Sequence, residues 1–196
     1  MKRLSIYLFL ILFTLQTPSQ ADDIRDFQIE GLSIGDSLLD YMTVNEINNL
    51  KRNYAKSKRY YVTGFSNSIN TYDSVDIYLK YGDTNYEIRS ISGVIFMDNK
   101  KKCKNQMNQV LKELRGLFNS AKLVTYDNIA HSYDETGKSR QEQAAFLLKN
   151  KNHDDHIRIE CTDWSKKLEN ERNWRDNFSI TAYTKEILDW FIAGYN

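Results

Sequence analysis

The chain has 196 residues, and its 27 lysine and arginine residues nearly balance 26 aspartate and glutamate residues, for a net charge of +1. A chain of this length can bury a single hydrophobic core. The near-neutral charge argues against nucleic acid as a partner, because phosphate binding needs a basic surface.

The first 21 residues have the pattern of a secretory signal peptide. Basic residues precede an apolar run over residues 4–15, and Ser19 and Ala21 supply the small side chains that a cleavage site needs. An uncleaved membrane anchor is the alternative, but the run is shorter than the ~20 apolar residues of a spanning helix. We expect cleavage after Ala21, a periplasmic or secreted location, no stable membrane span, and one globular domain over residues 22–196.

Short elements are expected in the first part of this domain. Phe27 and Ile29 alternate with polar residues, which predicts a short strand. A pair of short helices should follow, the second over residues 44–53, because Thr43 and Glu46 have the spacing of a capping box. A β-rich segment then ends in a polar loop.

The stretch over residues 75–118 has the clearest pattern. Alternating apolar residues predict a strand over 75–80, a tight turn, and a longer strand over 86–97. A helix capped by Asp98 or Asn99 should follow, because apolar side chains recur there at helical steps: Cys103, Met107, Val110, Leu111, Leu114 and Phe118.

The remaining elements are mostly strands. The patterns predict a strand (121–126), a polar loop (127–140), a hairpin (143–149 with 156–162), a charged loop (164–177), a last strand (178–184) and a closing helix (185–192). This order predicts an α+β fold, in which an antiparallel sheet has one long amphipathic helix packed on a face and is preceded by a short helical pair.

The only two cysteines, Cys103 and Cys161, are expected to form a structural disulfide. Cys103 lies on the apolar side of the long helix, and Cys161 shares a strand face with Ile157 and Ile159. Both sulfur atoms should therefore point into the helix–sheet interface, and an exported protein would oxidise them. Two unpaired thiols and a catalytic cysteine are the alternatives. The opposite strand face carries His156, Arg158, Glu160 and Thr162.

One cluster has the residue types of a metal site: His153, Asp154, Asp155 and His156. It lies at the expected hairpin tip, where turn geometry by itself favours aspartate and asparagine. A solvated turn is therefore the favoured interpretation, and the sequence predicts neither a bound metal nor a cofactor.

No known catalytic signature is present, since the sequence lacks a Gly-x-Ser-x-Gly elbow, a His-Glu-x-x-His pair and a phosphate-binding glycine loop. His131 lies near Asp134 and Glu135, which would allow an acid–base pair, but a polar loop explains the same residues. No catalytic residue is therefore predicted.

Aromatic residues make up 13% of the chain. Rings on outer strand faces or in loops would form a recognition surface for a protein, a peptide or a glycan. Strand propensity alone also enriches tyrosine, and this simpler explanation is favoured. The candidate rings are Tyr60, Tyr61, Tyr78, Tyr81, Tyr183, Trp164 and Trp174.

Two segments carry a resemblance to other proteins. Residues 29–41 read IEGLSIGDSLLDY, and residues 161–165 read CTDWS. With these segments the chain resembles a group of uncharacterised exported proteins of marine bacteria, over most of the part that follows the signal peptide. The resemblance implies an exported single-domain protein and no particular activity, substrate or catalytic residue.

These patterns together predict an exported, non-enzymatic binding or interaction module with a protein, peptide or glycan partner in the cell envelope. A small exported hydrolase or metal-dependent enzyme, using His131 or residues 153–156, is the first alternative. An accessory protein for envelope assembly is the second.

Overall fold

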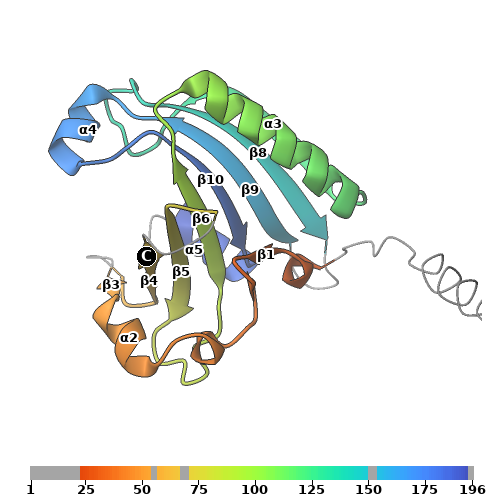
Figure 1. The fold of residues 1–196 in the computed structure, drawn as a ribbon, viewed down its shortest axis with the longest axis vertical. Helices are drawn as coiled ribbons and strands as arrows, with labels where there is room; N and C mark the ends of the chain where they lie inside the picture. Colours follow the sequence, from red (N-terminus) through yellow and green to blue (C-terminus); the bar gives the residue numbers. More distant parts are fainter. Residues whose placement is uncertain (1–22, 54–56, 67–70, 150–153, 194–196) are drawn as a thin grey trace, which may run out of the picture.

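The structure is a computed structural model that describes residues 23–53, 57–66, 71–149 and 154–193, so the expected signal peptide lies outside it. Its main feature is an eight-stranded antiparallel sheet with the strand order β3-β4-β5-β6-β10-β9-β8-β7 (Figure 1). The strands are β3 (Arg52–Asn53), β4 (Tyr60–Ser66), β5 (Ser74–Lys80), β6 (Ser90–Phe96), β7 (Lys122–Ala130), β8 (Arg140–Lys149), β9 (Asp154–Asp163) and β10 (Asn177–Tyr183). Two short strands, β1 (Gln28–Ile29) and β2 (Leu32–Ser33), form a separate sheet.

Helices and 3₁₀ turns complete the described chain. They are η1 (Ile24–Asp26), η2 (Leu38–Asp40), α2 (Val44–Asn49), α3 (Lys100–Leu117), α4 (Lys166–Arg172) and α5 (Lys185–Ile192). Within the described residues, no helix is long and apolar enough to cross a membrane.

The strand order explains where α3 lies. Strand β6 is central and pairs with β10, whereas β7 forms the far edge of the sheet. Because α3 connects β6 to β7, the chain must cross β10, β9 and β8, and α3 packs against β9 and β10 on the way. Figure 1 shows the helix lying along this half of the sheet. Its buried residues, Cys103, Met107 and Leu114, follow the expected apolar stripe.

The N-terminal elements cover the rest of the same face. Helix α2 contacts β4, β1 contacts β6, and η1 contacts β9. The main hydrophobic core lies between these elements, α3 and the sheet, and it includes the fully buried residues Ile77, Ile91, Phe146 and Ile159. Each such side chain stabilises the fold by about 1.5–3 kcal/mol relative to an exposed one.

A second, smaller core lies on the other face, where α5 packs. It consists of Tyr60, Tyr183, Ile187 and Trp190. The Trp190 indole donates a hydrogen bond to Ser57 Oγ at 3.1 Å, which satisfies the polar end of this buried ring. Helix α5 therefore closes only one part of this face.

The expected α+β fold class is wrong. The described chain is mostly β. Within it no single long helix covers the sheet, because α3 and the N-terminal elements share one face and α5 lies on the other. The expected helical pair is a 3₁₀ turn and a six-residue helix. The first four residues of the expected loop over residues 127–140 are strand, since β7 continues to Ala130. This edge strand is exposed on both faces and so lacks the alternation that marks a half-buried strand.

Several local predictions are confirmed. Helix α5 has the expected bounds, and Thr43 and Glu46 form the capping box of α2. Asn99 caps α3, because its side chain accepts a hydrogen bond from Lys102 N at 2.9 Å. Strands β8 and β9 pair as an antiparallel hairpin. The expected charged loop over residues 164–177 contains α4 instead.

The predicted disulfide is present. Cys103 of α3 and Cys161 of β9 are bonded, and both residues are buried at the helix–sheet interface. The bond joins the first half of α3 to the strand beneath it, at a sequence separation of 58 residues. It therefore holds the crossing helix on its half of the sheet.

Removal of this disulfide should destabilise the protein. Closing a loop of 58 residues restricts the unfolded chain, and such a restriction is worth about 4 kcal/mol. We expect the double variant Cys103→Ala/Cys161→Ala to lose about 3–4 kcal/mol in urea denaturation, and the reduced wild-type protein to lose a similar amount. Equal urea midpoints for the wild type and the double variant would contradict this role.

Candidate functional site

A cavity of about 670 Å³ lies on the face of the sheet opposite α3. Its floor is formed by β5, β6, β8, β9 and β10, and its ends by the loop after β7, by Trp164 and by α5. Sites that hold small molecules typically have volumes of about 300–1,000 Å³. The cavity is therefore large enough for a ligand of that kind.

Strand alternation places the residues of the floor. In β9, Arg158, Glu160 and Thr162 line the cavity, whereas Cys161 between them is bonded to α3. The cavity-facing residues of neighbouring strands are paired directly with one another, so they form rows across the sheet, which we call levels. From one end to the other, the levels are Gln141, Thr162 and Asn177; Gln143, Glu160, Ser179 and Val94; Arg158, Thr181, Ser92 and Asp76; and Tyr183 with Tyr78.

A network of polar contacts connects the middle of the floor. Arg158 Nε lies 3.2 Å from Glu160 Oε2, and Arg158 Nη2 donates to the Tyr183 hydroxyl. Glu160 Oε1 accepts hydrogen bonds from Gln143 Nε2 at 2.7 Å and from Gln141 Nε2 at 3.4 Å. The Glu160 side chain is only 10% exposed, and these contacts offset the desolvation of its carboxylate.

Arg158 and Tyr183 keep unused hydrogen-bonding capacity. The Arg158 side chain is 33% exposed, and its guanidinium carries five N–H donors, of which the described contacts use those directed at Glu160 and Tyr183. Burial raises the pKa of Tyr183 to about 12, so its hydroxyl stays protonated and can donate while it accepts from Arg158. The floor can therefore form further hydrogen bonds.

Four rings cluster at one end of the cavity, and we call them the aromatic quartet: His131, Tyr133, Trp164 and Trp174. Ring centroids are 5.5 Å apart for His131 and Tyr133, 4.2 Å for His131 and Trp164, and 4.4 Å for the two tryptophans. The first separation lies within the range of about 4.5–7 Å for favourable aromatic contacts, and the other two lie just below it. His131, Tyr133 and Trp164 line the cavity, and Trp174 packs against Trp164.

Asp134 fixes the loop that carries two rings of the quartet. Its buried carboxylate accepts hydrogen bonds from the backbone N and Oγ of Ser139, at 2.8 and 2.6 Å, and from the backbone N and Oγ1 of Thr136, at 2.9 and 2.6 Å. These bonds hold the pKa of Asp134 well below its ordinary value of 3.8. Ser139 Oγ in turn accepts from the backbone N of Ser165, which follows Trp164. The loop is thus tied to the segment that carries the other two rings.

His131 is neutral at physiological pH. Burial, and to a smaller extent the charge of Arg158, lowers the pKa of His131 from 6.5 to about 4. Its Nδ1 accepts a hydrogen bond from the backbone N of Tyr133 at 3.1 Å, so the ring proton lies on Nε2. The Asp134 carboxylate binds Ser139 and Thr136 instead of the imidazole, so the acid–base pair weighed from the sequence is not formed.

The other end of the cavity is aromatic and aliphatic. Tyr78 and Tyr183 each contact Phe191 of α5 edge to face, with centroid distances of 5.2 and 5.7 Å. Leu188 and Ile192 of the same helix complete this end. A ligand that spans the cavity would therefore meet rings at both ends and polar groups between them.

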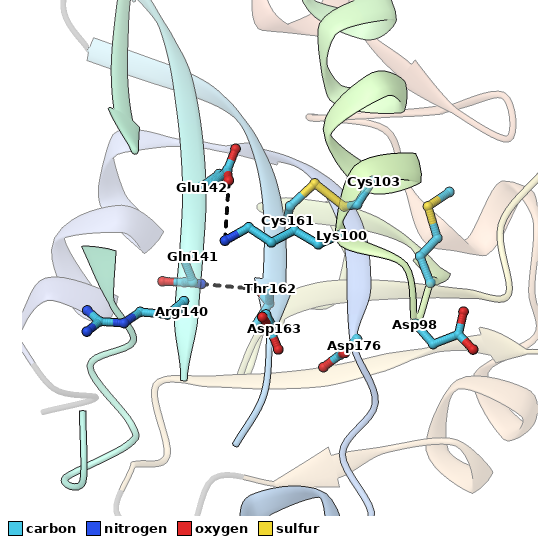
Figure 2. Close-up of a pocket in the computed structure, with 11 residues that line it drawn as sticks. Asp98, Lys100, Cys103, Arg140, Gln141, Glu142, Cys161, Thr162, Asp163 and Asp176 are labelled. Atoms are coloured by element: carbon cyan, nitrogen blue, oxygen red, sulfur yellow. Dashed lines mark hydrogen bonds and ion pairs between the residues drawn. A yellow bond between two sulfur atoms is a disulfide. The ribbon is translucent and has the colours of Figure 1, made fainter. Parts of the chain in front are cut away.

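A smaller hollow of about 80 Å³ lies beside the disulfide, where α3 begins (Figure 2). Figure 2 shows Lys100 of α3 reaching toward Glu142 of β8, at 3.6 Å between Nζ and Oε1. Lys104 Nζ lies 2.9 Å from the other Glu142 oxygen. These ion pairs join α3 to the sheet, and the hollow is below the size of ordinary ligand sites. We interpret it as structural.

Of the metal-type cluster predicted from the sequence, the structure describes the side chains of Asp155 and His156. Asp155 and His156 are consecutive residues of β9, so they point to opposite faces of the strand. Asp155 accepts a hydrogen bond from the backbone N of Lys185 at 3.0 Å, at the start of α5. His153 and the side chain of Asp154 lie outside the described part of the chain. Among the described residues, no group of three or more His, Cys, Asp or Glu could hold a metal ion.

Several side chains that line the cavity were placed correctly from the sequence, but the cavity itself was not predicted. It assigned Arg158, Glu160 and Thr162 correctly to one strand face, without a function. Of the candidate rings, Trp164, Tyr78 and Tyr183 line the cavity, whereas Tyr60 and Tyr61 are buried in the two cores. Two features of the sequence could have indicated the cavity. One face of the β9 segment is polar and carries both an acid and a base, Glu160 and Arg158. The β10 segment, which pairs with it, also has polar side chains at every second position, Ser179, Thr181 and Tyr183.

Comparisons with known proteins found no similar family model, curated protein or solved structure. The resemblance to exported proteins of marine bacteria therefore stays a prediction, and the chemistry of the site is inferred from its geometry.

Replacement of Asp134 should loosen the aromatic quartet. The variant Asp134→Ala leaves Ser139 and Thr136 without their shared acceptor, so we expect its melting temperature to fall by about 5–10 °C. Circular dichroism measures this change, and tryptophan fluorescence reports the loosened rings. Exposed Glu135 offers a matched control, because Glu135→Ala should leave both signals unchanged. A melting temperature equal to that of Glu135→Ala would contradict the assigned role.

Protonation of His131 should make stability depend on pH. Because the pKa of His131 is lowered from 6.5 to about 4, the unfolded chain binds a proton below pH 6.5 that the folded protein does not bind until about pH 4. Stability should therefore fall as the pH drops through this window, by about 1–2 kcal/mol once solvent screening of the partly exposed ring is included.

The variant His131→Phe keeps a ring against Trp164 and removes the titration. Urea denaturation at about pH 7 and about pH 4.5 should show a smaller loss of stability for this variant than for the wild type. An equal loss in both proteins would show that His131 is not the group responsible.

Proposed function

We propose that this protein is an exported binding protein that holds a small polar ligand in the cavity on the open face of its sheet. The cavity itself carries this proposal, with its volume of about 670 Å³ and its successive levels of polar side chains between two aromatic ends. Concave sites with a few convergent polar groups are where proteins usually bind small molecules.

Export is supported by two features. The N-terminal sequence has the pattern of a signal peptide. The buried disulfide between Cys103 and Cys161 is the kind of bond that forms and persists in oxidising compartments. The periplasm and the extracellular medium both fit these features.

Binding is favoured over catalysis because the ionisable groups near the cavity are already engaged. Glu160 is paired with Arg158 and accepts two amide hydrogen bonds. Asp134 holds its own loop, and His131 is a neutral donor. Such mutual contacts fix side chains before a ligand arrives, and this preorganisation favours affinity because less ordering is needed on binding.

Occlusion of the cavity tests this proposal. Ser179 lies in the middle of the floor, on β10 between Glu160 and Val94. The variant Ser179→Phe should fill the cavity and prevent binding, whereas Thr125→Phe on the exposed edge strand β7 should not. The probes are neutral oligosaccharides, dipeptides and dicarboxylates, each screened by thermal shift.

We expect one class of probe to raise the melting temperature of the wild type and of Thr125→Phe by about 5 °C, and to leave Ser179→Phe unchanged. Circular dichroism confirms that each variant is folded, and Gln143→Leu serves as a second cavity variant. The proposal is wrong if no class stabilises the wild type more than the two cavity variants.

A further inference from the structure

The charges that line the cavity are balanced. Among its lining residues, those that can be charged near neutral pH are Asp76, Arg158, Glu160 and His131. Arg158 is paired with Glu160, and Asp76 Oδ1 lies 2.5 Å from Arg52 Nη2. His131 is neutral. An anionic ligand at Arg158 would also meet the carboxylate of Glu160, and a cationic ligand at Glu160 would also meet the guanidinium of Arg158, so an uncharged ligand fits best.

The polar groups of the floor are suited to hydroxyl groups. Hydroxyls and amides both donate and accept, as the hydroxyl groups of a ligand also do. Planar carboxylate, amide and guanidinium groups can each bind two neighbouring hydroxyls at once. The hydroxyl and amide side chains of the floor are Ser92, Gln141, Gln143, Thr162, Asn177, Ser179, Thr181 and Tyr183.

An apolar ligand fits this floor poorly. Gln141, Thr162 and Thr181 are already buried beneath the cavity. An apolar molecule over them would remove water without replacing its hydrogen bonds, and each unsatisfied buried polar group is unfavourable.

The aromatic rings supply the complementary contact. The faces of a pyranose ring carry C–H groups, which pack on aromatic side chains, while its edge carries hydroxyls. Trp164 is held against His131 at 4.2 Å and against Trp174 at 4.4 Å, so its orientation is fixed before a ligand binds. Tyr78 and Phe191 offer further rings at the opposite end.

The length of the cavity favours more than one sugar unit. Along β10, the lining residues run from Asn177 to Tyr183, six residue steps or about 20 Å at the rise of an extended strand. This span exceeds a single sugar ring and suits a linear chain that runs along the strands over their polar faces.

We propose that the cavity binds a neutral linear oligosaccharide, with Trp164 and His131 against a sugar ring at one end and with Gln143, Glu160 and Arg158 bonded to hydroxyls in the middle. This inference rests on the proposed binding function and specifies its ligand class. Trp164 acts as the stacking platform and Gln143 as a hydrogen-bonding contact.

Isothermal titration calorimetry on the disulfide-bonded protein tests the inference. The probes are neutral cello-, laminari-, malto- and chito-oligosaccharides, with an anionic oligogalacturonate and dipeptides for comparison. The variants are Trp164→Ala, which removes the ring, Trp164→Phe, which keeps a ring of smaller area, and Gln143→Ala. Circular dichroism shows whether each variant is folded, and Gln143→Ala remains informative if Trp164→Ala is not.

We expect one neutral oligosaccharide to bind the wild type, with a Kd about tenfold weaker in Trp164→Ala and Gln143→Ala and less than about threefold weaker in Trp164→Phe. Equal binding to all of these variants would contradict the assigned contacts. If the charged oligosaccharide or a dipeptide binds instead, and Ser179→Phe abolishes that binding, the ligand class is wrong and the binding function stands. If no probe binds in a manner that Ser179→Phe abolishes, both proposals are wrong.

Discussion

The two-residue alternation of side chains along β9 and β10 determines which groups lie in the core and which face the cavity. In β9, Ile157, Ile159 and Cys161 face α3, whereas Arg158 and Glu160 face the opposite side. A shift of one residue in register would bury the charged pair under α3 and expose the isoleucines. The disulfide between α3 and β9 opposes such a shift, because it joins the helix to one position of the strand.

The two faces of the sheet are stabilised differently. The face under α3 is apolar and gains its stability from burial. The cavity face holds polar groups with little access to water, so they must satisfy one another, as Arg158, Glu160 and Gln143 do. At its rim, Asp134 orders a loop through hydrogen bonds and thereby positions the aromatic quartet. The proposed ligand site and the stability of the fold thus depend on the same contacts.

The local parts of this structure could be predicted from the sequence, whereas their assembly could not. Helix α5, the β8–β9 hairpin and the disulfide have periodic or compositional signals. Strand β7 is exposed on both faces, and α4 buries only Leu168. Neither segment therefore has a clear period of apolar residues, and the predicted fold class was wrong. The cavity depends on the pairing of β6 with β10, which places Ser92 beside Thr181. No local pattern encodes that long-range pairing.

The proposed ligand is neutral and rich in hydroxyl groups, and it lies on the open face of the sheet between the aromatic quartet and α5. Nuclear magnetic resonance of the ¹⁵N-labelled protein, titrated with the oligosaccharide probes, tests this proposal most directly. We expect shifts of the Trp164 indole signal and of backbone amides in β8, β9 and β10. Signals from the solvent-facing side of α3 and from the Trp190 indole, which donates a hydrogen bond to Ser57, should stay unchanged. Shifts confined to α3 or to the edge strand β7, or no shifts with any probe, would contradict the proposal.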